Sequence, residues 1–351
     1  MSQFAQTLIA WQARHGRHGL PWQASRDPYT VWLSEIMLQQ TQVDTVIPYY
    51  QRFLARFPTL ASLASAPVDD VLALWSGLGY YARARNLHRA AREVMTHHGG
   101  QFPQSAAVIA TLPGIGRSTA AAIAAFCFGE RAAILDGNVK RVLARHAGIE
   151  GFPGTRAIEQ SLWALAESLL PTEGVAHYTQ AMMDLGATVC TRSRPHCQRC
   201  PVAGTCVAHR EGRESTLPTP RPPRAIPERQ SRVLLARGEL GVLLQRRPDQ
   251  GIWGGLHALP EIPEGMDAQA YAQTLGLRCH GPAVPLAPIR HAFTHFRLTL
   301  EAQLCEVAGS SLHDPRWRWA DARAWDELGL PTPIRRLLDG LPSATQVSPQ
   351  A

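Results

Sequence analysis

The stretch Leu112-Pro113-Gly114-Ile115-Gly116 separates two segments with helical periodicity, residues 104–111 and 116–128. Pro113 ends the first helix because it lacks an amide hydrogen, and the two glycines permit a tight turn and the close approach of another backbone. The amides that follow open a second helix, and the N-terminus of a helix binds phosphate oxygens. A glycine turn between helices is common by itself. In a positively charged domain, however, this sequence predicts a DNA-binding helix-hairpin-helix.

Helical periodicity continues on both sides of this turn, up to about residue 190. Apolar residues recur at three- and four-residue spacing, and proline or glycine turns separate the segments. The predicted helices are residues 3–14, 29–40, 42–56, 68–75, 81–97, 104–111, 116–128, 138–147, 155–170 and 174–187. We therefore predict an all-α domain over residues 1–210.

The pattern changes after residue 210. Residues 211–228 are polar and proline-rich, which predicts an extended linker. Two-residue alternation and short apolar runs then predict strands at 231–236, 241–246, 296–307 and 316–320, with short helices at 268–275 and 333–340. We expect a second, smaller α+β domain over residues 229–341. Residues 342–351 are predicted to be a disordered tail.

Length and composition limit the class of protein. The 351 residues suit two domains, and 45% hydrophobic with 18% charged residues exclude a disordered chain. No run approaches the roughly 20 apolar residues that cross a bilayer, and the N-terminus has no signal-peptide layout. We expect a soluble cytoplasmic protein, a monomer with no membrane partner.

The net charge of +7 lies almost entirely in the first domain, where 19 basic residues outnumber 13 acidic ones. Positive charge concentrated in one domain indicates an anionic partner, most often nucleic acid. The alternative is a charge that only serves solubility. Lys140 is the only lysine in the chain.

Four of the seven cysteines lie within seventeen residues, as Cys190, Cys197, Cys200 and Cys206, with the spacing C-x6-C-x2-C-x5-C. Cysteines of a cytosolic protein rarely form a disulfide framework, whereas four thiolates bind either tetrahedral zinc or an iron–sulfur cubane. Zinc sites usually bring two close pairs and this loop has one, so the spacing favours iron–sulfur over zinc. The loop, about residues 188–208, also carries basic residues that either contact phosphates or merely offset the thiolate charge.

Two carboxylates are candidates for catalysis. Glu35 lies in the apolar helical stretch 31–38 and is predicted to be buried. Burial raises the pKa of a carboxyl group and suits a general acid or base; the alternative is a structural carboxylate with a partner. Asp136 follows the apolar run 132–135 and precedes a helix, which is the position of an ordinary N-cap. Asp136 can be a helix N-cap and a catalytic carboxylate at the same time.

Two further residues lie in turns near polar or basic groups. Gln40 is part of a run of amides at the end of the Glu35 helix, and Tyr80 follows a glycine turn beside arginines. Turn aromatics beside basic groups suit stacking on bases or wedging between them. The alternative is that Tyr80 and Tyr81 are core residues.

Taken together, these segments resemble one family. The motifs are LPWQ (20–23), PYTVWLSEIMLQQTQV (28–43), LWSGLGYYARARNL (74–87), LPGIGRSTA (112–120), ILDGNVKRVLAR (134–145), QAMMDLGA (180–187) and the cysteine loop. They are similar to those of adenine DNA glycosylases of the MutY type. The resemblance runs from about residue 8 to 210 and continues more weakly through the second domain. It implies excision of adenine paired with 8-oxoguanine or guanine in double-stranded DNA, after the adenine flips out of the helix. The composition, rich in alanine and arginine with one lysine, indicates a GC-rich bacterial genome, so we expect the protein to act at the bacterial nucleoid.

The resemblance also implies roles for single residues. Glu35 matches the general acid that protonates adenine N7, and Asp136 matches the carboxylate that stabilises the oxocarbenium-like sugar. Asn138 is similar to the residue that polarises the site, and Gln40 and Tyr80 match residues that wedge into the DNA. The four cysteines match the ligands of the family's [4Fe-4S] cluster. Further DNA contacts are expected from Leu112, Gly114, Gly116, Ser118 and Lys140.

Ser118 separates this interpretation from endonuclease III-type enzymes, which share the fold, hairpin, aspartate and cluster but carry a lysine at this position. That lysine attacks the sugar and then cuts the strand, which needs an unprotonated amine. Apart from the N-terminus, only Lys140 could supply one here. We therefore predict a monofunctional glycosylase. The alternatives are an oxidised-pyrimidine glycosylase/lyase and a non-catalytic DNA-damage binder, which would gain nothing from Glu35 in an apolar helix.

The second domain resembles the Nudix-like domain that such glycosylases carry. Residues 251–260 are similar to the strand region before a Nudix box, but 267–277 contain one acidic residue, Asp267, in place of the several glutamates that hold Mg²⁺. Nucleotide hydrolysis is therefore disfavoured, and recognition of the 8-oxoguanine strand is favoured. Phe293-Thr294-His295 matches the family's Phe-Ser-His loop, which contacts the oxidised base. The alternative for His295 is a histidine at a strand edge.

Overall fold

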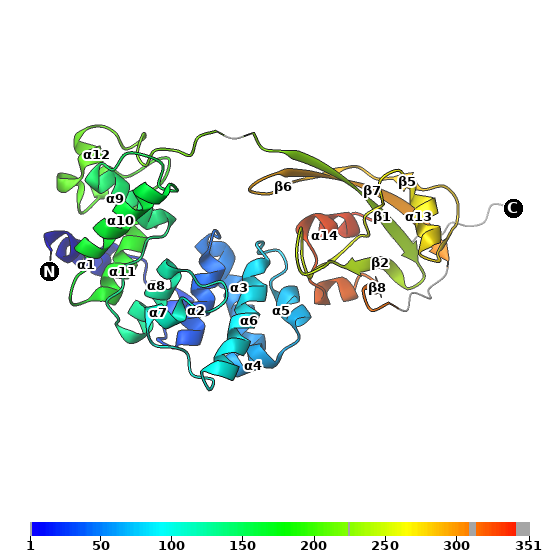
Figure 1. The fold of residues 1–351 in the computed structure, drawn as a ribbon, viewed down its shortest axis with the longest axis horizontal. Helices are drawn as coiled ribbons and strands as arrows, with labels where there is room; N and C mark the ends of the chain where they lie inside the picture. The colour runs from blue at the N-terminus through cyan, green and yellow to red at the C-terminus, as the bar shows by residue number, and fades with distance from the viewer. Residues whose placement is uncertain (1, 224, 309–313, 342–351) are drawn as a thin grey trace. The chain divides into compact units, whose positions relative to one another are not determined.

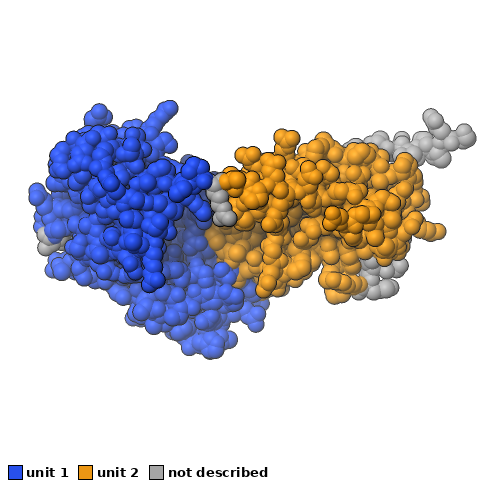
Figure 2. Space-filling model, turned by 45° about the horizontal axis from the view of Figure 1, so that its top comes forward, with its two compact units in different colours: residues 1–65, 86–223 blue, residues 66–85, 224–351 orange. Residues whose placement is uncertain are grey.

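The computed structural model describes residues 2–223, 225–308 and 314–341, and the chain divides into two compact units (Figure 2). Unit 1 comprises residues 1–65 and 86–223, and unit 2 comprises residues 66–85 and 224–351. The predicted tail, residues 342–351, lies outside the described residues. Within the described ranges, none of the helices combines the length and the apolar character that a membrane span requires.

Unit 1 is helical, which confirms the prediction for this part of the chain (Figure 1). Its longer helices are α1 (Gln3–His15), α2 (Pro28–Leu38), α3 (Val43–Arg56), α6 (Ala82–His97, beginning in unit 2), α8 (Arg117–Phe128), α9 (Gly137–Ala147), α10 (Arg156–Leu169) and α11 (Val175–Asp184). Its shorter elements are η1 (Pro21–Gln23), α4 (Leu60–Ser65), α7 (Ala106–Ile109), η2 (Leu185–Val189), η3 (Cys197–Arg199), η4 (Ala203–Thr205) and α12 (Val207–Arg210). Five of these elements were not predicted, because three to six residues are too few for a periodic pattern: η1, α4, η3, η4 and α12.

The helix ends follow their capping residues. The Ser2 hydroxyl accepts a hydrogen bond from the Ala5 amide and begins α1. Helix α8 ends at Gly129, whose backbone is left-handed with φ 70°. Helix α2 ends at Leu38, two residues earlier than predicted, because Gln40 has φ 58°, a conformation that a right-handed helix cannot contain.

Helices α1, α8, α9, α10 and α11 share one hydrophobic core. Leu8, Leu143 and Leu162 are fully buried in it. The alanines on α8 from Ala120 to Ala125 are buried as well, and α2 and α11 both pack against this helix. Small side chains let neighbouring helices approach closely, which brings the start of α8 next to α2.

Unit 2 combines α5 (Val68–Leu74) with a mixed sheet (Figure 1). The strands are β1 (Glu228–Gly238), β2 (Gly241–Arg246), β3 (His257–Ala258), β4 (Arg278–Cys279), β5 (Val284–Pro285), β6 (Ile289–Ala292), β7 (Arg297–Ala308) and β8 (Trp317–Ala320). The order is β3-β2-β1-β7-β4, with β5 and β6 also on β7 and β8 on β2. Strands β1 and β7 run parallel, and the other pairs are antiparallel.

The two faces of this sheet carry separate cores because successive side chains of a strand point to opposite sides. Val233 and Leu235 of β1 pack on the side of α14 (Thr332–Asp339). Leu234 and Ala236 pack on the side of α13 (Ala268–Thr274). A short helix, η5 (Ala324–Glu327), precedes α14. The predicted α+β architecture is therefore confirmed for unit 2.

Residues 66–85 belong to unit 2 by their contacts, although sequence order placed them within residues 1–210. The hydroxyls of Ser76 and Tyr81 donate to the carbonyl of Leu330 at 2.9 and 3.2 Å. A Cβ added to Gly329 would stand 3.1 Å from the Leu72 Cβ, so the two backbones lie close together. These partners are about 250 residues away in the sequence. The spacing of apolar residues therefore could not predict that residues 66–85 belong to unit 2.

The first half of the predicted linker packs on unit 1. Leu217 is buried, its carbonyl accepts a hydrogen bond from Arg145, and the Thr219 hydroxyl accepts one from the Gly151 amide. Strand β1 begins at Glu228. The extended connection is therefore shorter than the proline-rich stretch.

Candidate active site

A cavity of about 1810 Å³ opens in unit 1. Its walls come from the end of α1, the loop between α1 and α2, α2 itself, the starts of α8 and α9, and one side of α11. Six residues predicted from the sequence line it: Glu35, Gln40, Ser118, Asp136, Asn138 and Lys140. The fold thus gathers residues from distant parts of the chain around one space.

Glu35 lies on α2, where its neighbours Ser34 and Ile36 are buried. The pKa of Glu35 is raised from 4.5 to about 8. Burial is the larger cause, and the negative charge of Asp136 is the smaller one. A carboxyl group without a cationic partner resists ionisation in such surroundings. Near neutral pH Glu35 therefore keeps the proton that a general acid donates.

Asp136 is the N-cap of α9, and its carboxylate accepts a hydrogen bond from the Val139 amide at 2.8 Å. Burial raises the pKa of Asp136, whereas bonds from the amides of Val139 and Asn138 and the charge of Arg141 oppose that shift. These hydrogen bonds favour the ionised form. Asp136 therefore caps the helix and also presents a carboxylate in the cavity.

Ser118 lies in the first turn of α8, and its hydroxyl accepts a hydrogen bond from the Leu135 amide at 2.9 Å. Leu135 is buried and directly precedes Asp136. The hydroxyl thus fixes the backbone that carries Asp136. The sequence left the function of this hydroxyl open, and the geometry assigns it an anchoring contact.

Arg141 connects the start of α9 to the cysteine loop. Its guanidinium donates to Asn138 Oδ1 at 2.8 Å and to the carbonyls of Gly186 and Cys190, both at 2.6 Å. A Cβ on Gly186 would stand 2.6 Å from the Asn138 Cβ, so a side chain cannot fit there. Asn138 is therefore held between Arg141 and the backbone of η2.

Lys140 lines the cavity, but its ammonium group is paired. The Nζ atom lies 2.6 Å from Glu159 Oε1. This ion pair holds the Lys140 side chain against α10, so the amine would have to leave Glu159 before it could attack a sugar.

Sequence reasoning missed the loop between α1 and α2 as a cavity wall, which Leu20, Trp22 and Arg26 help to form. Arg17 anchors this loop, since its amide and guanidinium donate to the Asp184 carboxylate at 3.0 and 2.8 Å. Asp184 is fully buried. An aspartate within an apolar helix signals a buried ion pair, but the partner lies 167 positions away.

The four loop cysteines line one small cavity of about 30 Å³. Cys190 follows the wide turn of η2, Cys197 begins η3, Cys200 follows η3, and Cys206 precedes α12. Burial, together with the charges of the other three thiols, raises the pKa of Cys200 to about 11. Four thiolates can therefore share this space only with a cation. A convergent set of four thiols with apolar walls fits an iron–sulfur cluster.

Arg145 is nearly fully buried beside this cavity. It donates to Cys190 Sγ at 3.4 Å and to the carbonyls of Thr191 and Arg192 at 2.7 and 3.0 Å. Its positive charge lies next to the thiols, where it offsets negative charge on a bound thiolate. This arginine was not singled out from the sequence.

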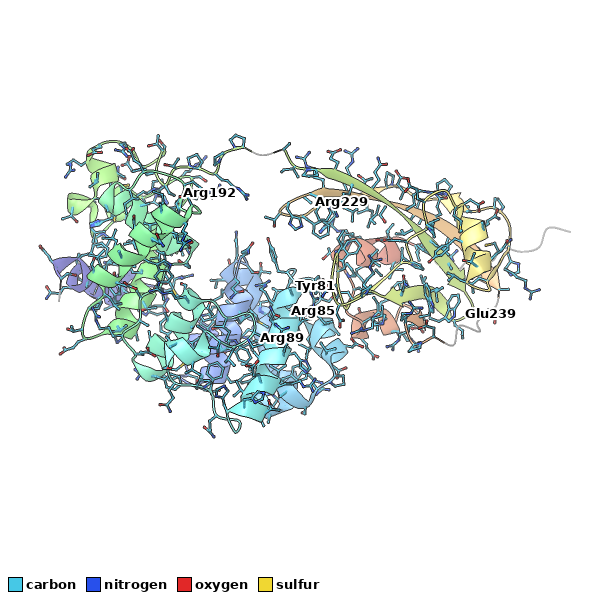
Figure 3. The ribbon with its side chains drawn as sticks, viewed as in Figure 1. Tyr81, Arg85, Arg89, Arg192, Arg229 and Glu239 are labelled. Carbon is cyan, nitrogen blue, oxygen red and sulfur yellow. The ribbon has the colours of Figure 1, made fainter. Side chains whose placement is uncertain are left out.

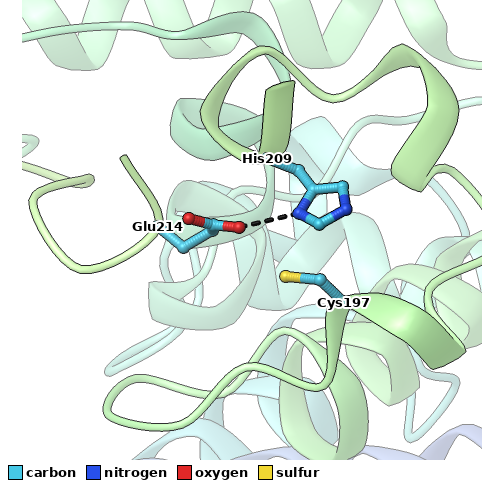
Figure 4. A group of neighbouring side chains, drawn as sticks. All are labelled: Cys197, His209 and Glu214. Carbon is cyan, nitrogen blue, oxygen red and sulfur yellow. Dashed lines mark hydrogen bonds and ion pairs between the residues drawn. The ribbon is translucent and has the colours of Figure 1, made fainter. Parts of the chain in front are cut away.

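Cys197 also has neighbours outside the thiol set. Its sulfur, the His209 imidazole and the Glu214 carboxylate lie within 4.8 Å of one another, and His209 Nδ1 is 2.7 Å from Glu214 Oε1 (Figure 4). Cysteine, histidine and carboxylate are also zinc donors. This trio, however, uses one loop cysteine and leaves three without a role, whereas the thiol cavity uses all four.

The predicted hairpin connects α7 to α8. Gly114 has φ 78°, and a Cβ there would stand 2.6 Å from the Asn86 Cβ. Gly114 and Gly116 are exposed, and the first amides of α8 have no partner within the helix. Leu112 is buried, and its amide and carbonyl bond to Ile109 and Ile115. The hairpin therefore offers backbone amides to a partner, and Leu112 holds it in place.

In unit 2, residues 293–296 form the turn between β6 and β7, here called the recognition turn. The Phe293 amide donates to the Phe296 carbonyl at 2.9 Å, and the two rings stack with centroids 4.3 Å apart. Phe296 is buried, whereas Thr294 and His295 are exposed at the tip. The Tyr80 hydroxyl lies 3.3 Å from the Thr294 hydroxyl. The structure thus brings Tyr80 to the predicted recognition residues.

Gln40 and Tyr80 share an unusual backbone. Their φ angles are 58° and 50°, and both side chains are exposed. Side chains other than glycine rarely adopt positive φ, and such strain collects at functional sites. The core interpretation of Tyr80 is therefore excluded, since nearly half of its surface, 48%, is exposed.

A helical unit with this hairpin and a cavity holding two carboxylates defines a base-excision DNA repair protein of the helix-hairpin-helix class. The model of that superfamily (HhH-GPD superfamily base excision DNA repair protein) matches residues 33–168, and a NUDIX domain model matches residues 232–340. Solved structures agree on the fold. A thermostable thymine-DNA glycosylase superposes with a TM-score of 0.54 and 29% identity, over 59% of this chain and 95% of that one. Endonuclease III in a non-covalent DNA complex gives a TM-score of 0.51 and 21% identity, over 60% and 96%.

Relatives that match nearly the whole of this chain show the family. The adenine DNA glycosylase of Buchnera aphidicola subsp. Acyrthosiphon pisum is 35% identical, over 96% of this chain and 97% of that one. That of Rattus norvegicus is also 35% identical, over 93% and 75%, and that of Homo sapiens is 33% identical, over 96% and 73%. The chain belongs to the adenine DNA glycosylase family, whose members are base-excision repair enzymes and usually carry an iron–sulfur cluster.

Proposed function

We propose that this chain hydrolyses the N-glycosidic bond of adenine paired with 8-oxoguanine or guanine in double-stranded DNA. The observation that carries the proposal is Glu35, whose pKa is raised to about 8 in the same cavity as the Asp136 carboxylate. A protonated and an ionised carboxyl group in one site are the requirement for acid-catalysed glycoside cleavage. An adenine flipped out of the duplex would occupy the space between them.

Each carboxyl group has one role in this reaction. Glu35 donates its proton to N7 of adenine, and the base leaves with the electron pair of the glycosidic bond. The sugar becomes an oxocarbenium-like cation, which the negative charge of Asp136 stabilises. Water then adds to C1′ and gives up a proton to the Glu35 carboxylate, which leaves an abasic site and restores the acid. Ser118 and Asn138 support this step by holding the start of α9.

DNA contacts come from backbone and side-chain groups of different kinds. The exposed amides at Gly114, Gly116 and the start of α8 suit a phosphate. Gln40 and Tyr80, exposed and strained, suit insertion into the base stack. The positive charge of residues 1–210 favours the same partner. The enzyme would act as a monomer in the bacterial cytoplasm.

The four cysteines would hold a [4Fe-4S] cluster. Bound there, the cluster would cross-link the loop that also bonds to Arg141 and Arg145. The test is the purified protein's visible absorption and metal content. Iron at about four atoms per chain with broad visible absorption supports the proposal, and zinc without visible absorption refutes it. Cys200→Ser should lower the iron content in parallel.

The catalytic proposal is tested with a duplex that holds one 8-oxoguanine·adenine pair and a label on the adenine strand. Each single-turnover time point is divided, and one half is heated in alkali. Breaks only after alkali are the expected result, because Ser118 replaces the lyase lysine and Lys140 is paired with Glu159. Breaks without alkali would show a lyase. Absence of breaks in both halves, with iron present, would favour a binder.

A further inference from the structure

Among the described residues, Gln40, Tyr80 and Trp253 are the side chains other than glycine that have positive φ. The first two are the proposed wedge residues, and Trp253, with φ 57°, has had no role so far. It lies in the turn between β2 and β3, residues 247–256. A bulky side chain is strongly disfavoured in this conformation, so its contacts must compensate for the strain.

The contacts of the Trp253 ring point to the recognition turn. The ring centroid lies 6.0 Å from that of Phe293 and 6.4 Å from that of His291. Phe293 contacts His291 edge-on at 4.7 Å and stacks on Phe296 at 4.3 Å. Arg229 covers the Phe296 ring from β1 at 4.7 Å (Figure 3). Trp253 is thus one side of an aromatic cluster that lies beneath Thr294 and His295.

The backbone of the same turn contacts the segment that carries Tyr80. The carbonyl of Gly254 accepts a hydrogen bond from Arg85, which lies near the start of α6 (Figure 3). A Cβ on Gly254 would stand 2.3 Å from the Asp249 carbonyl oxygen, so the turn is closed tightly and admits no side chain there. Trp253 therefore lies next to a fixed backbone point that also fixes Arg85.

These contacts form a closed circuit within unit 2. Tyr80 bonds to Thr294 through their hydroxyls, Thr294 follows Phe293, and Phe293 packs on Trp253. The turn of Trp253 then returns to Arg85, five residues after Tyr80. Residues 80–85 therefore contact the distant segment 253–294 at two points, Tyr80 at Thr294 and Arg85 at Gly254.

We propose that Trp253 is a positioning residue for recognition of the base opposite adenine. It acts through Phe293 and sets the orientation of the recognition turn relative to Tyr80, so that 8-oxoguanine and guanine are distinguished. Trp253 belongs to unit 2, whereas Glu35 and Asp136 belong to unit 1. This inference rests on the proposed function, because it concerns the specificity of that reaction.

The test compares binding of 8-oxoguanine·adenine and guanine·adenine duplexes, measured by fluorescence anisotropy in a Glu35→Gln background to prevent excision. Trp253→Leu should lower the ratio of the two affinities by about tenfold, the size expected for a residue that acts through a neighbour. Trp253→Phe, which keeps an aromatic ring, should restore most of the ratio. With Glu35 intact, the excision rate at saturating enzyme should remain that of the parent.

Trp319→Leu is the matched control, because Trp319 packs on the opposite face of the same sheet. It should lower the thermal midpoint of unfolding without changing the affinity ratio. An unchanged ratio in Trp253→Leu would overturn the inference, as would an equal loss in both tryptophan variants. If Trp253→Leu does not fold, Arg85→Met decides, because it removes the hydrogen bond to the Gly254 carbonyl. A parental ratio in Arg85→Met then overturns the inference. Failure of the proposed function looks different, since the parent itself would then excise adenine from neither duplex.

Discussion

The cavity of unit 1, which we propose is catalytic, and the recognition turn of unit 2, which we propose selects the substrate, are organised by different physical means. In the cavity, Glu35 is a half-buried carboxyl group whose pKa is raised by its surroundings, and Asp136 is oriented by backbone amides. In the recognition turn, Thr294 and His295 are exposed, and stacked rings below them fix the backbone. Burial thus tunes reactivity at one site, whereas packing fixes geometry at the other. Substitutions in the cavity should change rates, and substitutions at the turn should change the choice of substrate.

The largest expected effect is that of Glu35→Gln. The amide keeps the size of the side chain but cannot donate the proton, so the rate of adenine release should fall about 10²–10⁴-fold. Binding of the same duplex should persist. Single-turnover excision and anisotropy measure the two quantities. A variant that loses both binding and rate would show that Glu35 also holds the DNA. The cavity would then no longer differ from the recognition turn as a site that affects only the rate.

The pH dependence of the wild-type enzyme should follow the same carboxyl group. Because the pKa of Glu35 is raised to about 8, the rate of adenine release should decline as the pH rises above 8. The declining limb should be absent from the residual activity of Glu35→Gln. Single-turnover rates between pH 6 and 9.5 test this. If the rate declines above pH 8 in the same way in both proteins, the decline is caused by a titrating group other than Glu35.

Stability should also fall with rising pH, but over a lower pH range than the rate. Between pH 4.5 and 8 the unfolded chain releases the Glu35 proton while the folded protein retains it, so the free energy of unfolding falls as the pH rises through this window and is flat above it. Glu35→Gln removes the penalty. It should be more stable than the wild type at pH 8, by at most about 5 kcal/mol, and equal to it near pH 4.5. Denaturant unfolding at both pH values measures the difference, and equal stabilities at pH 8 would contradict the raised pKa.

Much of the cavity was predictable because its parts are local. The apolar stretch around Glu35 predicted a buried carboxyl group, and the run before Asp136 predicted a helix cap; both signals come from neighbours within four residues. The loop wall was not predictable, because Arg17 and Asp184 meet only through the tertiary fold. The same holds for residues 66–85, whose place in unit 2 depends on Leu330.

The sheet of unit 2 shows the same limit. Strand β7 was predicted because its long alternation is visible in the sequence, whereas β4, β5 and β6 are short and exist through pairing with β7. The recognition turn lies between a predicted strand and a missed one. Its residues were therefore found by resemblance, and the stacking that supports them by structure.

A smaller effect on the excision rate is expected from Ser118, whose hydroxyl binds the backbone next to Asp136. Ser118→Ala leaves the Leu135 amide without its acceptor at 2.9 Å, which should lower the free energy of unfolding by about 1–2 kcal/mol. Adenine release should slow about tenfold, because Asp136 loses part of its orientation. Ser118→Thr keeps the hydroxyl and is the matched control. A rate in Ser118→Ala equal to that of the wild type would limit the hydroxyl to a structural contact.

The smallest effect is expected at the recognition turn, and it separates the two sites most clearly. Thr294→Val keeps the shape of the side chain but removes the hydroxyl that lies 3.3 Å from Tyr80. The turn itself should persist, because Phe293 and Phe296 still stack. The preference for 8-oxoguanine·adenine over guanine·adenine should fall about threefold to tenfold, the loss expected for one hydrogen bond, while excision at saturating enzyme stays constant. Thr294→Ser should retain the preference, and Thr299→Val on β7 controls for the loss of a hydroxyl elsewhere in the hairpin. If Thr294→Val instead slows excision and leaves the preference intact, the recognition turn contributes to the chemical step, and the division between a site tuned by burial and a site fixed by packing is wrong.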